Sequence, residues 1–208
     1  MKSCVVSLCC VLFALGSSAA AAAPADKAKA KADVSADYRV GDRLAPGVGA
    51  SAPDTDVFKA TEWDALVPKD WDPMKGIDRL SLAMLRDSDP RAKEALDKLK
   101  QAWDAAPVAP AMNNARIRIA GFVVPLDAEG EAIHEFLLVP YFGACIHTPP
   151  PPANQVIHVT LATPAKGVRM MDAIWVTGVM HTTSSDTGMG TAGYRMDGQS
   201  VRPYQGKR

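Results

Sequence analysis

The sequence contains few cysteines, and nearly all of them lie in one place. Three of the four fall within the first ten residues, which leaves Cys145 as the only thiol further along the chain. The early three belong to an apolar run that follows Lys2 and precedes the small residues SSAAAAAPA, the pattern of a secretory signal peptide over residues 1–23. Once this segment is removed, an internal disulfide is excluded, because Cys145 has no second cysteine to pair with.

Long hydrophobic runs are also lacking. The apolar part of residues 1–23 is too short to span a bilayer and leads directly into small residues. We therefore predict an exported, soluble protein of the periplasm. A lipoprotein is the less favoured alternative, because Leu8 precedes Cys9 and Cys9 precedes Cys10, where a lipidation site has small residues.

The chain has no excess of charge of either sign. It carries 23 basic and 23 acidic residues. This balance provides no extended positive field to attract nucleic acid or anionic lipid, so binding to either is not expected. The residues after the predicted cleavage near Ala23 are enough for one domain with a hydrophobic core and an extension.

Composition divides this remaining chain into three parts. Residues 24–56 are rich in Ala, Lys, Asp, Gly and Pro and have few large apolar side chains, which predicts a flexible linker. Residues 57–110 are predicted to form a helical extension packed on the core. Trp63 and Leu66 have the spacing of a helical turn, for which Thr61 is a plausible cap.

The clearest helix of this extension is predicted within residues 88–107. Asp89 suits the N-cap and Pro90 the first helical position. Its apolar stripe is predicted to be core material; the stripe consists of Ala92, Ala95, Leu96, Leu99, Ala102 and Trp103.

From Arg116 onward the hydrophobic period changes from helical spacing to alternation. We predict strands over residues 116–126, 133–140, 154–161, 173–180 and 192–196. Gly121 and Gly178 lie inside two of them and indicate bulges or sharp coiling. The fold expected for residues 111–208 is a small five-stranded barrel of the OB type, and the whole chain is mainly β with an N-terminal helical extension (α+β).

Several stretches resemble an uncharacterised bacterial family catalogued as domain of unknown function 3299. The resemblance rests on WDALVPKDW, RIAGFVVPLD, EFLLVPYFGACIHTPPPPANQ and IWVTGV, within about residues 58–204. It implies an exported protein or lipoprotein with genes beside those of ABC-type permeases and ATPases, in some cases under zinc-responsive control. It does not point to any particular enzymatic activity. Metal homeostasis or envelope transport is the theme that the resemblance suggests.

The sequence YFGACIHTPPPPANQ places a thiol and an imidazole two residues apart. A thiolate with an imidazole favours zinc or copper, and we name zinc as the cofactor to test. Two ligands do not complete a zinc site, so other histidines would have to converge on Cys145 and His147. The candidates are His134, His158 and His181, although their spacing fits no standard zinc pattern.

Two other interpretations of this stretch remain open. Cys145 lies between apolar neighbours, as a buried structural thiol does, and a reactive nucleophile assisted by a histidine is the third alternative. The four prolines lock the backbone into an extended rod that keeps the loop rigid. This rod packs on nearby aromatic residues, forms a surface for a partner, or does both; the predicted partner-binding residues are Pro149, Pro150, Pro151, Pro152, Asn154, Tyr141 and Phe142.

The sequence therefore favours a non-enzymatic periplasmic accessory protein. It would bind a metal ion or a component of an ABC-type transporter, either the permease or a periplasmic binding component. The alternatives are a Cys/His-dependent periplasmic enzyme and a structural adaptor that docks on a membrane permease without a ligand.

Overall fold

The computed structural model describes residues 38–45, 57–72, 74–75, 89–126, 132–144 and 150–205. All of them belong to one compact unit, Asp33–Arg208. Before the barrel lie strand β1 (Lys59–Ala60), the 3-10 turn η2 (Trp63–Leu66), helix α2 (Pro90–Asp104) and the 3-10 turn η3 (Pro110–Met112). The barrel region contains β2 (Ala115–Pro125), β3 (Ala132–Val139), η4 (Ala153–Gln155), β4 (Ile157–Lys166), β5 (Ala173–His181), β6 (Ser185–Thr187), β7 (Gly190–Ala192) and β8 (Tyr194–Pro203).

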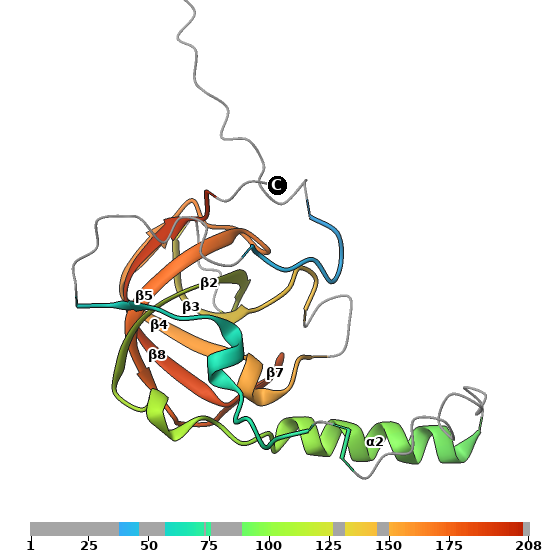
Figure 1. The fold of residues 1–208 in the computed structure, drawn as a ribbon. Coiled ribbons are helices and arrows are strands. Elements are labelled where there is room, and N and C mark those ends of the chain that lie inside the picture. The colour runs from blue at the N-terminus through green and yellow to red at the C-terminus, as the bar shows by residue number, and fades with distance from the viewer. Residues whose placement is uncertain are drawn as a thin grey trace, which may run out of the picture. The chain divides into compact units, whose positions relative to one another are not determined.

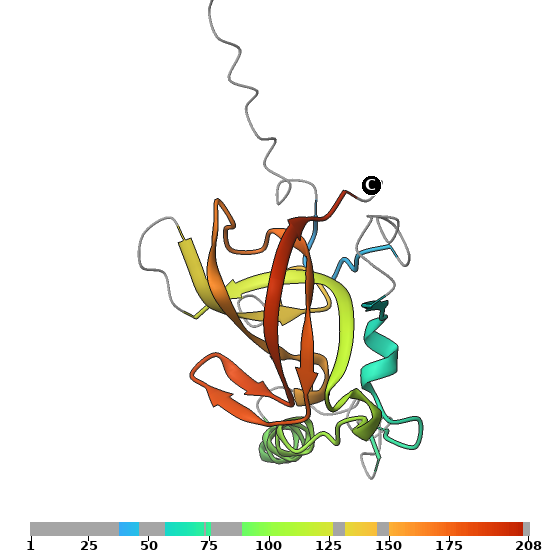
Figure 2. The same cartoon turned by 90° about the vertical axis from the view of Figure 1, so that its left-hand side faces the viewer.

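Five strands close into a mixed barrel (Figures 1 and 2). Their order is β2-β3-β4-β8-β5, and β5 returns to pair with β2. All neighbours are antiparallel except β4 and β8, which run parallel. The prediction of a small five-stranded OB-like barrel with a helical extension is confirmed, and closure leaves the barrel strands without a long unpaired edge.

The barrel strands are apolar on both faces because each face meets a different cluster. The first cluster draws residues from all five strands, such as Phe136 and Met196, and fills the barrel interior. The second takes the alternate residues, such as Phe122 and Leu137, and covers part of the outer surface. Since successive strand residues point to opposite faces, the two clusters together account for the uninterrupted apolar runs.

Part of the predicted flexible linker packs on this outer cluster. The ring of Tyr38 meets Phe122 edge-on at a centroid distance of 5.1 Å and stacks on Phe142 at 6.0 Å. Arg43 forms a β-bridge with Tyr141. Residues 38–45 therefore belong to the folded barrel unit, because their aromatic and aliphatic side chains find apolar partners that composition could not reveal.

Helix α2 begins as predicted, with the Asp89 carboxylate accepting a hydrogen bond from the Arg91 amide at 2.9 Å and Pro90 in the first turn. The prediction that its stripe is core material is wrong, because the helix contains no buried residue and Leu96 is 58% exposed. The connection to the core comes after the helix, where Ala106 is buried.

The remaining differences concern turns. Turn η2 has Glu62 at its N-cap and no side-chain cap, so the capping role predicted for Thr61 is wrong; its hydroxyl donates to the Lys59 carbonyl instead. The predicted short last strand is the ten-residue β8, and it follows a hairpin, β6–β7, that the sequence did not indicate. Within the described residues, no helix is long and apolar enough to cross a membrane.

Candidate functional site

The loop between β3 and β4 contains the Cys-x-His sequence. Cys145, His147 and Pro149 lie outside the described residues, so their predicted roles as metal ligands and partner contact stay predictions. The two stems of the loop, residues 140–144 and 150–155, are described.

The first stem is anchored to the N-terminal segment and to the barrel. The amide of Phe142 donates to the carbonyl of Asp42 at 2.9 Å, and the amide of Gly41 donates back to the carbonyl of Phe142 at 2.9 Å. The Phe142 ring meets Phe122 edge-on at 5.6 Å. Tyr141 and Phe142, predicted to bind a partner, are half-buried here, so part of each ring is already covered by the protein itself.

Gly143 and Ala144 complete this stem. Gly143 has φ +83°, a backbone conformation that disfavours other residues, and its amide donates to the sulfur of Met171 at 3.2 Å. Ala144 is fully buried. The chain is therefore fixed up to the residue directly before Cys145.

The second stem is held by side-chain amides. Asn154 donates from Nδ2 to the Pro107 carbonyl at 3.0 Å, and Gln155 donates from Nε2 to the Trp63 carbonyl at 3.0 Å. Asn154 is completely buried, so it has no exposed surface to offer a partner. Its Nδ2 joins the segment after α2 to the loop, whereas its buried Oδ1 has no hydrogen-bond partner among the described residues.

The described prolines differ in exposure. Pro151 is buried, whereas Pro150 and Pro152 are half-buried. Pro152 has φ −53° and ψ 147°, close to polyproline II geometry. An added Cβ on Gly190 would lie 3.2 Å from the Pro150 Cβ, so hairpin β6–β7 packs against the start of this stem. The prolines are therefore largely packed on the protein.

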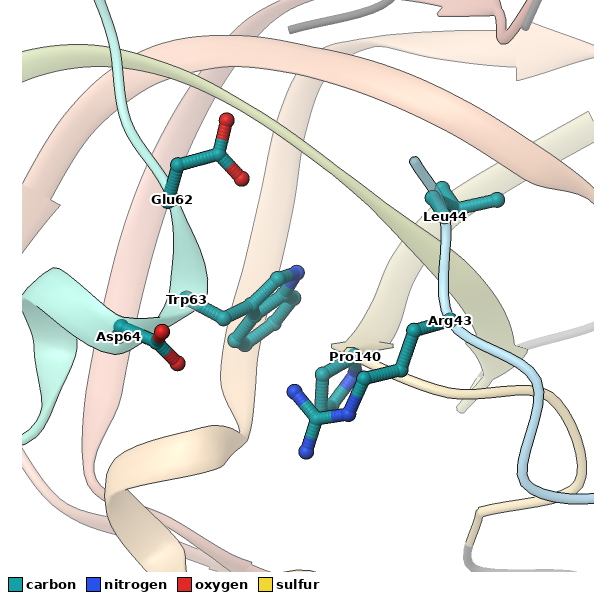
Figure 3. A pocket seen from close by; sticks show the side chains of 6 residues that line it. All are labelled: Arg43, Leu44, Glu62, Trp63, Asp64 and Pro140. Carbon is teal, nitrogen blue, oxygen red and sulfur yellow. The ribbon is translucent and has the colours of Figure 1, made fainter. Parts of the chain in front are cut away.

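A pocket of about 190 Å³ lies beside the first stem (Figure 3). Its lining comprises Arg43, Leu44, Glu62, Trp63, Asp64 and Pro140. The indole N–H of Trp63 donates to the Ala120 carbonyl at 2.7 Å, which fixes the aromatic wall. The guanidinium of Arg43 lies 5.8 Å from the Tyr141 ring centroid. The pocket thus combines an aromatic wall with one cationic and two acidic residues.

His158, on the outer face of β4, uses both ring nitrogens. Its Nε2 lies 2.5 Å from Oε1 of Glu135 on β3, and its Nδ1 lies 3.0 Å from Oγ of Ser185 on β6. Its side chain is 13% exposed. A metal ion at His158 would have to displace one of these partners.

His181 and His134 have partners of their own. Nε2 of His181 is 3.0 Å from Asp197, whose other oxygen accepts from Arg195 at 2.8 Å. The hydrogen bond from Arg195, followed by that from His181, lowers the pKa of the Asp197 carboxyl, and its partial burial opposes this shift. His134 is exposed at a register irregularity of β3, with Nδ1 3.3 Å from the Leu161 carbonyl oxygen.

Within the described part of the chain, His134, His158 and His181 each contact a different group. No group of three or more His, Cys, Asp or Glu side chains there could hold a metal. His158 and His181 each engage a separate carboxylate, whereas a zinc site needs at least three protein ligands around one point. Zinc binding would therefore depend on Cys145, His147 and groups beyond those described.

Sequence reasoning missed Ser185, Glu135 as the partner of His158, and the pocket residues Arg43 and Asp64. Alternation offered a signal for Arg195 and Asp197, which flank the buried Met196 on β8. No comparable signal marks Ser185, because its strand is only three residues long and its contact is with a residue 27 positions away.

Comparison with known proteins gives a family and a related structure. The family described as "Protein of unknown function (DUF3299)" matches residues 63–203. A solved structure, the crystal structure of a DUF3299 family protein from Pseudomonas aeruginosa PAO1, is 30% identical, with a TM-score of 0.56. The match covers 73% of this chain and 99% of that one. No curated protein matches the sequence.

Proposed function

This chain belongs to the DUF3299 family. From that premise and the anchoring of the two stems of its β3–β4 loop, we propose that it is an accessory binding protein of the bacterial envelope. It would act in the periplasm. Its partner is the permease or the periplasmic binding component of an ABC-type transporter, and the role of the loop is binding rather than catalysis.

The observation that carries the proposal is the anchoring of both loop stems. Ala144 and Asn154 are fully buried on either side of the loop, and each stem is tied to a different N-terminal segment. A loop held at both ends loses less conformational entropy when it binds than a free one does. Cys145 and His147 lie between these anchors in the sequence.

The pocket beside the first stem adds a second contact area. Trp63 supplies an aromatic wall, and Arg43 and Asp64 contribute opposite charges to the lining. Aromatic residues and arginine often dominate binding energy at protein interfaces, while charges at a rim steer association. A partner side chain inserted beside Trp63 would be the expected anchor.

Zinc is the ligand we propose for the loop. A first experiment titrates the secreted protein with Zn²⁺ and follows binding by native mass spectrometry. We expect about one equivalent to bind to the wild type, and we expect Cys145→Ser combined with His147→Ala to abolish binding. Lys100→Glu, on the exposed face of α2, is the control and should retain it. Unchanged binding by the double variant would contradict the zinc assignment.

A second experiment tests the partner. The protein is mixed with a reconstituted ABC-type permease or with its binding component, and affinity is measured by surface plasmon resonance. Reversal of charge at the pocket, Arg43→Glu or Asp64→Lys, should weaken binding at least about tenfold, because a charge of the lining would become repulsive. Lys100→Glu, on the exposed face of α2, is the control. Equal affinities for all variants would exclude the pocket from the interface.

A further inference from the structure

A serine, a histidine and a glutamate form a continuous hydrogen-bonded chain on the barrel surface. Oγ of Ser185 lies 3.0 Å from Nδ1 of His158, and Nε2 of His158 lies 2.5 Å from Oε1 of Glu135. The three residues come from β6, β4 and β3, so the tertiary fold alone brings them together. None of the three belongs to the stems of the β3–β4 loop or to the residues that line the pocket beside Trp63.

The carboxylate fixes which nitrogen carries the proton. An ionised carboxylate only accepts hydrogen bonds, so the bond to Glu135 requires the proton of neutral His158 to be on Nε2. Nδ1 is then the acceptor and faces the Ser185 hydroxyl, which donates to it. This is the arrangement of nucleophile, base and orienting acid, with the two ring nitrogens in exchanged roles relative to the familiar serine hydrolases.

We propose that Ser185 is a nucleophile activated by His158 and Glu135, and that the protein hydrolyses small acyl esters at this site. This inference goes beyond the proposed binding function and departs from the non-enzymatic expectation. The His158 side chain is 13% exposed, whereas that of Glu135 is 42% exposed, so the imidazole is shielded and the carboxylate is open to solvent. Ser185 is half-buried, so the hydroxyl retains contact with solvent.

Positive charge lies on the same face. Arg195 of β8 is the register neighbour of His158 on β4 and also of His181 on β5. Register neighbours point to the same side of a sheet, so the guanidinium belongs to the surface that carries Ser185 and His158. Arg195 also donates to Asp197 at 2.8 Å, so its charge is shared with that carboxylate. A guanidinium on this face favours the oxyanion that forms during acyl transfer, and Arg195 is the electrostatic candidate for that step.

The chemistry balances with water as the only co-reactant. Ser185 Oγ attacks the ester carbonyl carbon and passes its proton to His158 Nδ1, and Glu135 stabilises the imidazolium through Nε2. The tetrahedral intermediate then collapses, which breaks the bond between the carbonyl carbon and the oxygen of the leaving alcohol. His158 donates its proton to that alcohol as it departs. Water, deprotonated by His158, then attacks the acylated serine and releases the acid, and the proton returns to Ser185.

The test uses the full chain with two probes, p-nitrophenyl acetate and a fluorophosphonate. We expect hydrolysis above the buffer rate and a fluorophosphonate adduct on Ser185 in the peptide mass spectrum. Ser185→Ala should remove the adduct and lower hydrolysis by about a hundredfold or more. Ser184→Ala removes the neighbouring, exposed hydroxyl and should change neither result.

Two further measurements separate a nucleophile from a structural hydrogen bond. Glu135→Gln preserves side-chain size and should reduce the hydrolysis rate at least about tenfold, with near-UV circular dichroism unchanged. Folded wild-type protein that forms no adduct on Ser185, or that labels Ser184 and Ser185 equally, overturns the proposal. These outcomes are independent of the zinc and transporter experiments, because the variants used here leave Cys145, His147 and Arg43 unchanged.

Discussion

The hydroxyl of Tyr194, at the start of β8, donates a hydrogen bond of 2.6 Å to the carbonyl oxygen of Leu66 in turn η2. The same hydroxyl accepts a hydrogen bond of 2.6 Å from the amide of Ala109. Tyr194 and Leu66 are both fully buried. One side chain of the barrel thus satisfies two backbone groups of the N-terminal extension and holds both of its ends, one before helix α2 and one after it.

Replacement of Tyr194 by Phe should destabilise the protein by about 1–3 kcal/mol, because the Leu66 carbonyl and the Ala109 amide would lose their buried partner. Urea unfolding followed by tryptophan fluorescence measures the change. Tyr204→Phe is a useful comparison, since among the described residues the Tyr204 hydroxyl bonds one backbone group, the Ala45 carbonyl at 2.8 Å. This variant should therefore lose less stability than Tyr194→Phe. Equal losses for both variants would contradict the double tether.

Stability should also fall at alkaline pH because of Tyr194. Burial raises the pKa of its hydroxyl above the ordinary value, and the hydrogen bond from the Ala109 amide acts in the opposite direction. A raised pKa in the folded state means that the stabilisation is fully present below the pKa of an unfolded tyrosine, about 10, and is lost as pH rises through the folded pKa.

Urea midpoints measured between about pH 8 and about pH 11 test this dependence. The midpoint of the wild type should decline more steeply than that of Tyr194→Phe. Some decline should remain in the variant, because burial also raises the pKa of Tyr204. Parallel curves for the two proteins would show that Tyr194 does not titrate in the way its burial requires.

Gly178 of β5 should not tolerate a side chain. A Cβ added there would lie 2.5 Å from the Asp197 carbonyl oxygen and 2.9 Å from Cγ of Met196. This is the point where the register between β5 and β8 shifts, so the close approach is part of barrel closure. We expect Gly178→Ala to lower the free energy of unfolding by about 1–3 kcal/mol, because the backbone atoms it meets cannot move independently.

The control for this substitution is Gly188→Ala in the turn between β6 and β7. A Cβ at Gly188 meets no atom within 4 Å, so stability should change little. Thermal unfolding of both variants under the same conditions makes the comparison. A Gly178→Ala protein as stable as the wild type would mean that the β5–β8 approach relaxes without cost.

Some of this organisation could be predicted because it depends on residues close in the chain. The alternation after Arg116 predicted four of the barrel strands to within a few residues, and Asp89 with Pro90 located the start of α2. Gly121 and Gly178 were marked as points of strong coiling, and an added Cβ at either position meets backbone atoms within 3 Å. These patterns depend on neighbouring residues in the chain, so they hold in the folded barrel as well.

Other features could not be predicted because their partners are distant in sequence. Residues 38–45 look like a linker by composition, yet Tyr38 packs against Phe122 and Phe142. Asn154 looks like an exposed turn residue after four prolines, yet it is enclosed and bound to Pro107. In each case the burial comes from a segment that composition and periodicity cannot place.

The sequence by itself determined that the chain carries a β-barrel with a helical extension, since alternation, capping residues and glycine positions act over a few neighbouring residues. Only the tertiary structure decided what the histidines contact. His158 contacts Glu135 and Ser185, and His181 contacts Asp197. Within the described residues, no group of three or more His, Cys, Asp or Glu side chains could hold a metal ion. The physical reason is that strand pairing and barrel closure determine which side chains share a face. The residue pattern along one strand does not specify which strands pair with it.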